Sequence, residues 1–117
     1  MPDTVAHREQ AEHNLRMYDS MDRSAYSDWA ATVLFYAALH YVDAFLARKL
    51  HYHPRGHADR DKLLHTVHAL KKIRVEYREL KDCSHNARYS PPYRPAPREL
   101  NQLRTLNIPA VVRTATS

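Results

Sequence analysis

The stretch from Tyr26 to Leu50 reads YSDWAATVLFYAALHYVDAFLARKL and decides the fold. Its apolar side chains recur every three or four residues, which is the spacing of a helix, and they form two adjoining stripes. One stripe comprises Tyr26, Ala30, Val33, Ala37, Tyr41 and Ala44, and the other comprises Leu34, Ala38, Val42 and Phe45. A helix with two apolar stripes is buried on more than one side. We therefore expect a helix over about 24–50 that is either the centre of a bundle or the carrier of both a core face and a dimer seam.

The rest of the chain contains few residues that break helices. Gly56 is the only glycine, and the prolines gather at Pro54 and from Pro91 onward. Sheets need turns, and turns usually need Gly, Asn or Pro at fixed positions. The pattern therefore predicts one all-α domain over residues 1–117, an up-down bundle of four or five helices. The expected segments are helices at about 4–21, 24–50, 58–84 and 98–106, a proline-rich corner at 89–97 and a frayed tail at 113–117.

Composition narrows the environment and the class of partner. The 117-residue chain has a formal charge of +5 and a sequence pI of about 9.5, which favours an anionic partner, most commonly nucleic acid. The single cysteine, Cys83, cannot form an internal disulfide, and the N-terminal residues lack the apolar run of a signal peptide. No run of 18 uninterrupted apolar residues occurs. We expect a soluble protein of the reducing cytoplasm that does not enter a membrane.

Four features in a fixed order resemble a known family. They are the segment AEHNL at 11–15, the long helix already quoted, His57 directly after Gly56, and the segment ARYSP at 87–91. This order is similar to the bacterial HEPN-like domains, whose name stands for higher eukaryotes and prokaryotes nucleotide-binding, and the resemblance covers about Ala6 to Leu106. It implies a bundle of four or five helices that often dimerises. Such domains occur as ribonuclease toxins, as partners of small nucleotidyltransferases and as noncatalytic accessory domains in phage-defence and stress systems.

The resemblance also implies where a catalytic motif would lie. Catalytic members share an Arg, a polar residue, three to five further residues and then a His. The pairs with this spacing are Arg8 with His13, Arg48 with His53, Arg60 with His65, and Arg78 with His85. Chance alone gives roughly three such pairs in a chain of this composition, so spacing does not identify a site. Arg78 and His85 lie near where catalytic relatives keep their pair, and they are the candidate catalytic residues.

The chemistry of metal-independent RNA cleavage suits Arg78 and His85. A histidine titrates near neutrality and can move the proton of a 2′-hydroxyl or of the leaving group. An arginine supplies a fixed positive charge that stabilises the phosphorane. The sequence therefore keeps an endoribonuclease among the possible functions.

The proline-rich corner allows two interpretations. Arg88, Tyr89, Tyr93 and Arg94 alternate cationic and aromatic side chains, which predicts nucleic-acid contact if the segment is exposed. The structural interpretation is favoured, with Arg88 capping the preceding helix or forming an ion pair and Tyr89 packing under the loop. Asn86 would then adopt the left-handed cap conformation, and the following prolines would prevent the helix from continuing.

Histidine-rich positions raise a metal site as a further alternative. His53 and His57 flank the predicted turn, and His65 and His68 lie one helical turn apart. Zinc prefers closed sets of Cys and His at tight spacings, and only one Cys is present. We therefore expect no metal and no cofactor.

Polar and aromatic residues of the long helix are expected to be structural. His40 lies in its middle and should be a core or seam histidine with Asp43 or a Tyr hydroxyl as its hydrogen-bond partner. Trp29 and the tyrosines at 26, 36 and 41 should pack in the core, because aromatic residues on an apolar helix face usually do.

These observations allow two functional classes and one purely structural alternative. The favoured hypothesis is a small helical module, expected to be a homodimer, that associates with RNA or with a partner protein such as a neighbouring-gene nucleotidyltransferase. Its setting would be bacterial defence, stress or a toxin–antitoxin system. The alternative is a metal-independent endoribonuclease toxin that uses an Arg/His pair. The third is a purely structural helical adaptor, which would bind nothing on its basic face.

Overall fold

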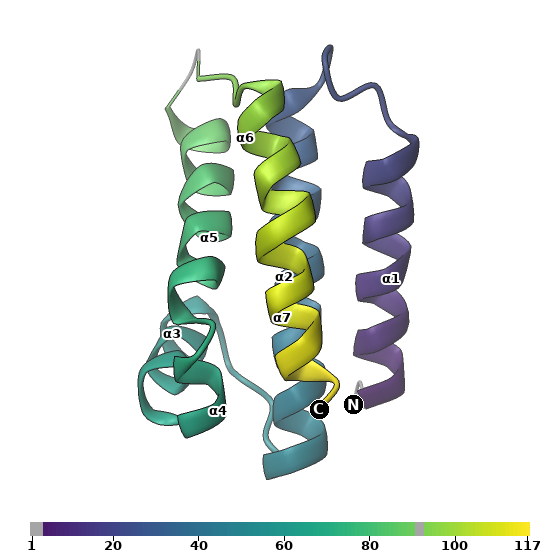
Figure 1. Cartoon of the computed structure of the whole chain (residues 1–117). Helices are drawn as coiled ribbons and strands as arrows, with labels where there is room; N and C mark the ends of the chain where they lie inside the picture. Colours follow the sequence, from purple (N-terminus) through teal and green to yellow (C-terminus); the bar gives the residue numbers. More distant parts are fainter. Residues whose placement is uncertain (1–3, 91–92) are drawn as a thin grey trace.

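The computed structural model of the protein describes residues 4–90 and 93–117. Helices occupy most of these residues, and no strand occurs among them, so the all-α prediction is confirmed (Figure 1). In chain order the elements are α1 (Thr4–Ser20), α2 (Ser27–Leu50), α3 (His57–Thr66), α4 (His68–Lys71), α5 (Arg74–Tyr89), α6 (Pro97–Gln102), the π-helical segment η1 (Leu103–Asn107) and α7 (Ile108–Ala115).

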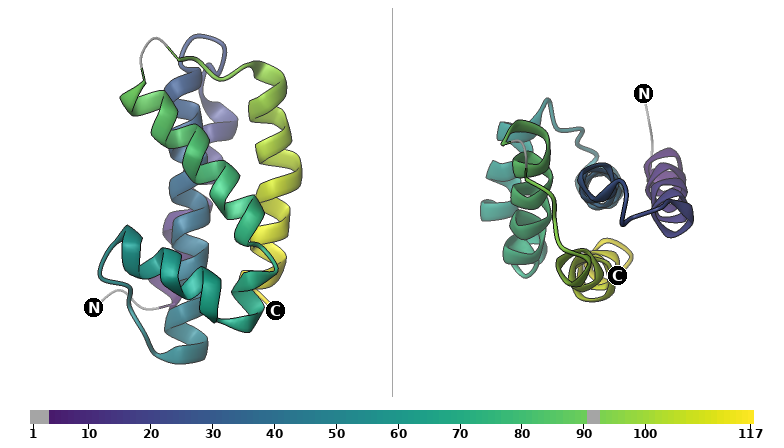
Figure 2. Two further views of the ribbon diagram at one scale, coloured as in Figure 1. Left: turned by 90° about the vertical axis from the view of Figure 1, so that its left-hand side faces the viewer. Right: turned by 90° about the horizontal axis from the view of Figure 1, so that it is seen from above.

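Helix α2 is the centre of the bundle. It packs against α1, α5 and α7, which surround it on three sides; it runs antiparallel to α1 and α5 and in the same direction as α7 (Figures 1 and 2). The side chains of Leu34, Phe35, Val42 and Leu46 have no exposed surface. Both apolar stripes read from the sequence are thus largely covered within one chain. By length and composition α2 is the one helix in the described residues that could cross a membrane, but 78% of its most apolar window is buried inside this bundle.

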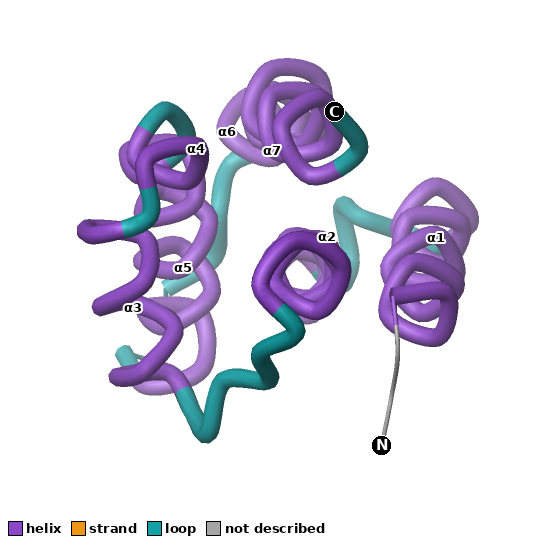
Figure 3. Tube along the Cα trace, turned by 90° about the horizontal axis from the view of Figure 1, so that it is seen from below, coloured by secondary structure: helices purple, strands orange, loops and turns teal. Residues whose placement is uncertain are grey.

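The helix expected at 58–84 is divided in the structure. Val67 has an extended backbone (φ −81°, ψ 120°) that separates α3 from α4, and α5 begins only at Arg74. The chain therefore turns back at α4, and α3 lies beside α5 instead of continuing into it (Figure 3). The seven-residue apolar rhythm does not reveal this break, because Leu64, Leu70 and Ile73 are all buried on the two sides of it.

Helix α5 also ends later than expected. Ala87 continues the buried face of Leu80 and Cys83 beyond residue 84, and the helix runs on to Tyr89. Asn86 therefore lies inside the helix and is not a left-handed cap. The non-glycine residue with a left-handed backbone in the described segments is His51 (φ 52°), which ends α2. The prolines expected to stop α5, 91 and 92, lie outside the described residues.

The last helical leg is longer than the helix expected at 98–106. It runs through α6, η1 and α7 as far as Ala115. Pro109 lies in the first turn of α7, directly after the widened π-helical turn, and such a turn accommodates a proline that lacks an N–H group. The tail is also held: Nη2 of Arg48 donates to the carbonyl oxygens of Ala115 at 2.7 Å and Ser117 at 2.9 Å. These bonds oppose the fraying expected at 113–117.

Three expectations about α2 need correction. His40 does not bond Asp43; its Nδ1 lies 3.2 Å from Nδ1 of His7 in α1. Asp43 instead accepts two hydrogen bonds from Arg60. Trp29 and Tyr26, at the start of α2, are 59% and 56% exposed instead of buried in the core.

Candidate nucleic-acid interface

Helix α5 carries a row of basic side chains along one face. Arg74, Arg78, Lys81, His85 and Arg88 follow one another at intervals of three or four residues. In an α-helix this spacing places all five on a single stripe. The first and last of them are 14 positions apart and therefore about 21 Å apart along the helix, at a rise of about 1.5 Å per residue. We call these five residues the α5 basic stripe.

The acidic residues of α5 lie away from this stripe. Glu76 and Glu79 belong to the side of the helix that faces η1, where Nδ2 of Asn107 donates to the carbonyl oxygen of Glu76 at 3.2 Å and to Oε1 of Glu79 at 2.9 Å. Asp82 lies between the two sides and lines clefts on both. Charge is therefore segregated around α5, and the basic side has a positive field that can attract an anion.

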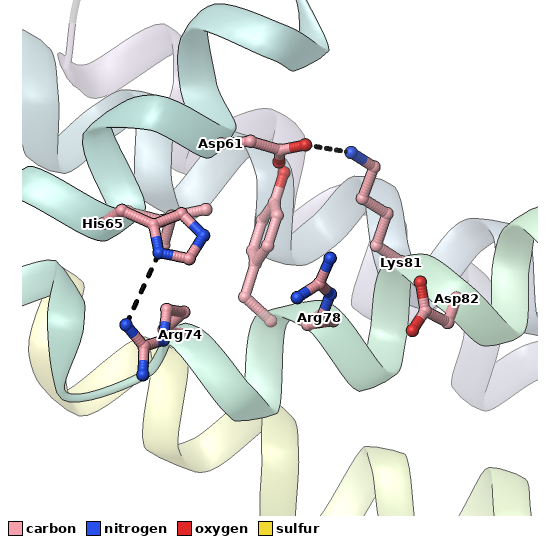
Figure 4. A pocket seen from close by; sticks show the side chains of 8 residues that line it. Asp61, His65, Arg74, Arg78, Lys81 and Asp82 are labelled. Carbon is pink, nitrogen blue, oxygen red and sulfur yellow. Dashed lines mark hydrogen bonds and ion pairs between the residues drawn. The ribbon is translucent and has the colours of Figure 1, made fainter.

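A cleft between α3 and α5 occupies the Arg74 end of the stripe. Its floor is formed by Leu64 and Tyr77, and its charged lining residues are Asp61, His65, Arg74, Arg78, Lys81 and Asp82. Two bridges connect α3 to α5 across it: Lys81 pairs with Asp61 at one end, and Nη1 of Arg74 lies 3.4 Å from Nδ1 of His65 at the other (Figure 4). Arg78 lies between the two bridges.

The other end of the stripe is a cluster of aromatic rings around Arg88. Its guanidinium lies 5.6 Å from the ring centroid of Tyr36 and 5.3 Å from that of Tyr89, which are cation–π distances. Its Nη1 also donates to the Tyr36 hydroxyl at 3.4 Å. The buried Nε has no hydrogen-bond partner within the described residues. A half-buried cation without a carboxylate partner is costly, so it marks a position where an external anion would be stabilising.

Tyr89 extends this cluster into solvent. Its side chain is 67% exposed, and its ring lies 4.9 Å from the ring of His85. The expectation that Tyr89 packs under the loop is therefore wrong, because α5 continues through this residue and turns its ring outward. An exposed aromatic ring beside cations is the arrangement on which nucleobases stack.

His57 approaches the same region from the start of α3. Its ring lies 5.9 Å from the ring of Phe35 and 6.5 Å from that of Tyr36. Burial lowers the pKa of His57, and the positive charges of Arg60, Lys81 and Arg88 lower it further. This imidazole is therefore mainly neutral at neutral pH and can accept a proton or a hydrogen bond.

The candidate catalytic residues Arg78 and His85 both belong to the α5 basic stripe. They are seven residues apart on one helix, hence two turns apart on the same face, and both are exposed. No hydrogen bond or ion pair engages the Arg78 guanidinium within residues 4–90 and 93–117. His85 is closer in sequence to Arg88, one turn further along, and it shares Tyr89 as a neighbour with that residue.

The candidates Tyr93 and Arg94 are not gathered with Arg88 and Tyr89. The Tyr93 hydroxyl donates to Oε1 of Glu99 at 2.9 Å. Arg94 donates to the Tyr93 carbonyl oxygen at 3.1 Å and lies 3.7 Å from a carboxylate oxygen of Asp28. These contacts tie the loop to α6 and to the start of α2, and the Arg94 side chain stays 57% exposed. The four residues expected to form one interface thus separate into two pairs.

The sequence pattern missed Arg74 and Lys81 of α5 and the residues that α3 and α2 bring to α5. Arg74 and Lys81 could have been found, because their spacing from Arg78 and His85 is visible in the sequence. His57, His65 and Tyr36 could not, since their approach to α5 depends on the chain reversal at α4.

The described residues contain no group of three His, Cys, Asp or Glu side chains placed to hold a metal ion. Burial raises the pKa of the Cys83 thiol to about 11, with Glu99 adding to the shift, so this thiol is protonated at neutral pH and is a poor nucleophile or metal ligand. Comparison with protein-family models, with curated proteins and with solved structures gave no match.

Proposed function

We propose that this protein is a small helical module that associates with RNA through the α5 basic stripe. The observation that supports the proposal is the unbroken row of five basic side chains, which ends in the exposed ring of Tyr89. Proteins that bind single strands without base-specific contacts combine a line of cations, which follows the phosphates, with aromatic rings that stack on bases. The HEPN-like resemblance agrees with this function.

The experiment compares RNA binding by two double variants. Arg78→Gln with Arg88→Gln removes two cations from the stripe, and Arg98→Gln with Arg113→Gln removes two exposed cations from other helices. The net charge changes equally in both variants, so a binding site on the stripe is distinguished from general attraction. We expect the stripe variant to lose about tenfold or more in affinity for a single-stranded RNA. Equal losses in the two variants would contradict the proposal.

A homodimer is part of the proposal. Trp29 and Tyr26 are exposed at the start of α2, and Val33 and Tyr36 continue this partly uncovered side of the helix. Large aromatic rings on a surface are typical of association sites. A second copy of the chain, or a nucleotidyltransferase encoded nearby, would cover them. Light scattering at tens of micromolar should give twice the chain mass, and Trp29→Ser should shift it toward the monomer.

The second candidate function is metal-independent RNA cleavage in the cytoplasm. It is favoured by the neighbourhood of His85, where Arg88 keeps a buried Nε–H unpaired and His57 approaches from α3. A histidine to move a proton and an arginine to hold the phosphorane are the groups that this reaction needs. The test is cleavage of RNA in the presence of a chelator. Loss of cleavage in both Arg78→Ala and His85→Ala, with the fold retained, would establish the enzyme over the binding module.

A further inference from the structure

The cleft between α3 and α5 has the size of a small polar group. Its volume is about 110 Å³, whereas clefts that enclose drug-sized molecules have about 300–1,000 Å³. A nucleobase with its sugar therefore does not fit. A few water molecules do, since each requires about 10–15 Å³ of such space, and a phosphate group occupies the space of a few waters.

The charges that line the cleft favour an anion. Arg74, Arg78 and Lys81 are cationic, and Asp61 and Asp82 oppose them. Lys81 is already paired with Asp61, so two guanidinium groups remain against one carboxylate. Guanidinium groups bind phosphate oxygens with two parallel hydrogen bonds each.

His65 lines the cleft beside one of these guanidinium groups. Its Nδ1 lies 3.4 Å from Nη1 of Arg74. This contact from α3 positions Arg74 at its end of the cleft.

The two bridges decide which kind of phosphate can enter. The Lys81–Asp61 pair and the Arg74–His65 contact close the cleft at its two ends along the α3–α5 groove (Figure 4). A strand cannot run through it, so an internal phosphodiester would have to enter and leave by the same mouth. A terminal phosphate needs only one opening, because the RNA chain continues on one side of it. It also carries a second negative charge above a pKa of about 6, which matches two guanidinium groups.

We propose that this cleft binds the terminal phosphate monoester of an RNA strand that lies along the α5 basic stripe. The inference rests on the proposed RNA association and adds an end preference to it. Arg74 and Arg78 then hold the strand end, and Arg88 with Tyr89 contacts the strand further along.

The experiment measures the binding of short RNAs that have one sequence and differ only at their ends. One carries a 5′-phosphate, one a 3′-phosphate and one only hydroxyl groups; inorganic phosphate is added as a competitor in a separate series. We expect one of the phosphorylated RNAs to bind about tenfold tighter than the hydroxyl-ended RNA, as one additional charge-assisted contact gives. Arg74→Gln and Arg78→Gln should each abolish this ratio.

The control variant is Arg88→Gln, which should weaken all the RNAs by one common factor and leave the ratio unchanged. Equal, salt-sensitive binding of all the RNAs would overturn the end preference and leave the proposed function standing. Absence of binding to any of them would overturn both. Competition by inorganic phosphate at the concentration of the RNA itself would assign free phosphate to the cleft and overturn the RNA-end proposal.

Discussion

Arg60 of α3 and Asp43 of α2 form a bidentate ion pair in the interior of the bundle. Nε of Arg60 donates to Oδ1 of Asp43 at 2.7 Å, and Nη2 donates to Oδ2 at 3.0 Å. Both side chains are only 8% exposed. Burial opposes the charge of Arg60, but the hydrogen bonds and the charge of Asp43 outweigh it, and the pKa of the guanidinium is raised. This pair fixes the start of α3 against α2, and thereby the position of α3 beside α5.

Replacing one partner of this pair should be strongly destabilising. Arg60→Met leaves the Asp43 carboxylate buried without a partner, and we expect a loss of about 3–5 kcal/mol in the free energy of unfolding. The double variant Asp43→Leu with Arg60→Met removes both charges and should recover most of that loss. Chemical denaturation of the wild type, the single variant and the double variant measures these free energies of unfolding. A single variant as stable as the wild type would show that the pair does not hold the fold.

Tyr93 and Tyr89 should respond in opposite ways to substitution. Tyr93→Phe removes the hydrogen bond to Glu99 and should cost about 0.5–1.5 kcal/mol of stability, with RNA affinity unchanged. Tyr89→Ala removes an exposed ring, so its stability should be close to that of the wild type while RNA affinity falls. Thermal melts and binding curves of both variants decide this. If Tyr93→Phe lost RNA affinity and Tyr89→Ala did not, the RNA interface would lie at Tyr93 in the proline-rich corner instead of at Tyr89.

Stability should decrease as the pH falls through the ordinary range of histidine. Burial lowers the pKa of His40 below its usual 6.5, and His7 and Arg60 add to this effect while Asp43 opposes it; burial also lowers the pKa of His57. The unfolded chain then binds more protons than the folded chain just below pH 6.5, so unfolding is favoured there. The melting temperature at about pH 5.5 should be lower than at about pH 7.5.

His40→Gln provides the control for this pH dependence. The amide does not titrate, so the difference in melting temperature between the two pH values should become smaller. An unchanged difference would mean that His40 is not among the groups responsible.

Cys83 should be unreactive while the protein is folded. The thiol is buried, and its pKa is raised to about 11, so almost no thiolate exists at neutral pH. A thiol reagent such as a maleimide or a disulfide dye should modify it slowly in the native protein and quickly in denaturant. Rapid labelling of the native protein would contradict the burial of this residue.

Much of the fold could be predicted from the sequence because its main signal is local. The double stripe of α2 and the scarcity of Gly and Pro report helix and burial directly, and both are confirmed. The break at Val67 could not be predicted, because apolar residues continue across it at a seven-residue repeat. The chain reversal is stabilised only by the packing of α3 on α5. The helical state of His85 to Tyr89 was missed for a related reason: Asn86 and the following prolines suggest a cap, but the buried face of α5 continues to Ala87.

The candidate site was predicted only in part. Arg78, His85, Arg88 and Tyr89 were named from the sequence, and the structure places all four on α5. Their joint arrangement as one stripe depends on α5 being a single helix through residue 89. The cleft depends on His65 and Asp61, which reach α5 only after the chain has turned at α4, so no sequence spacing could reveal it.

The salt dependence of RNA affinity tests the central claim most directly. If the α5 basic stripe neutralises three to four phosphates of a single strand, the logarithm of the affinity should fall against the logarithm of salt concentration with a slope of about −2 to −3. Arg78→Gln with Arg88→Gln should make that slope shallower by about 1.4, and Arg98→Gln with Arg113→Gln should leave it unchanged. A slope near zero for the wild type, or one slope shared by all three proteins, would contradict RNA association through this stripe.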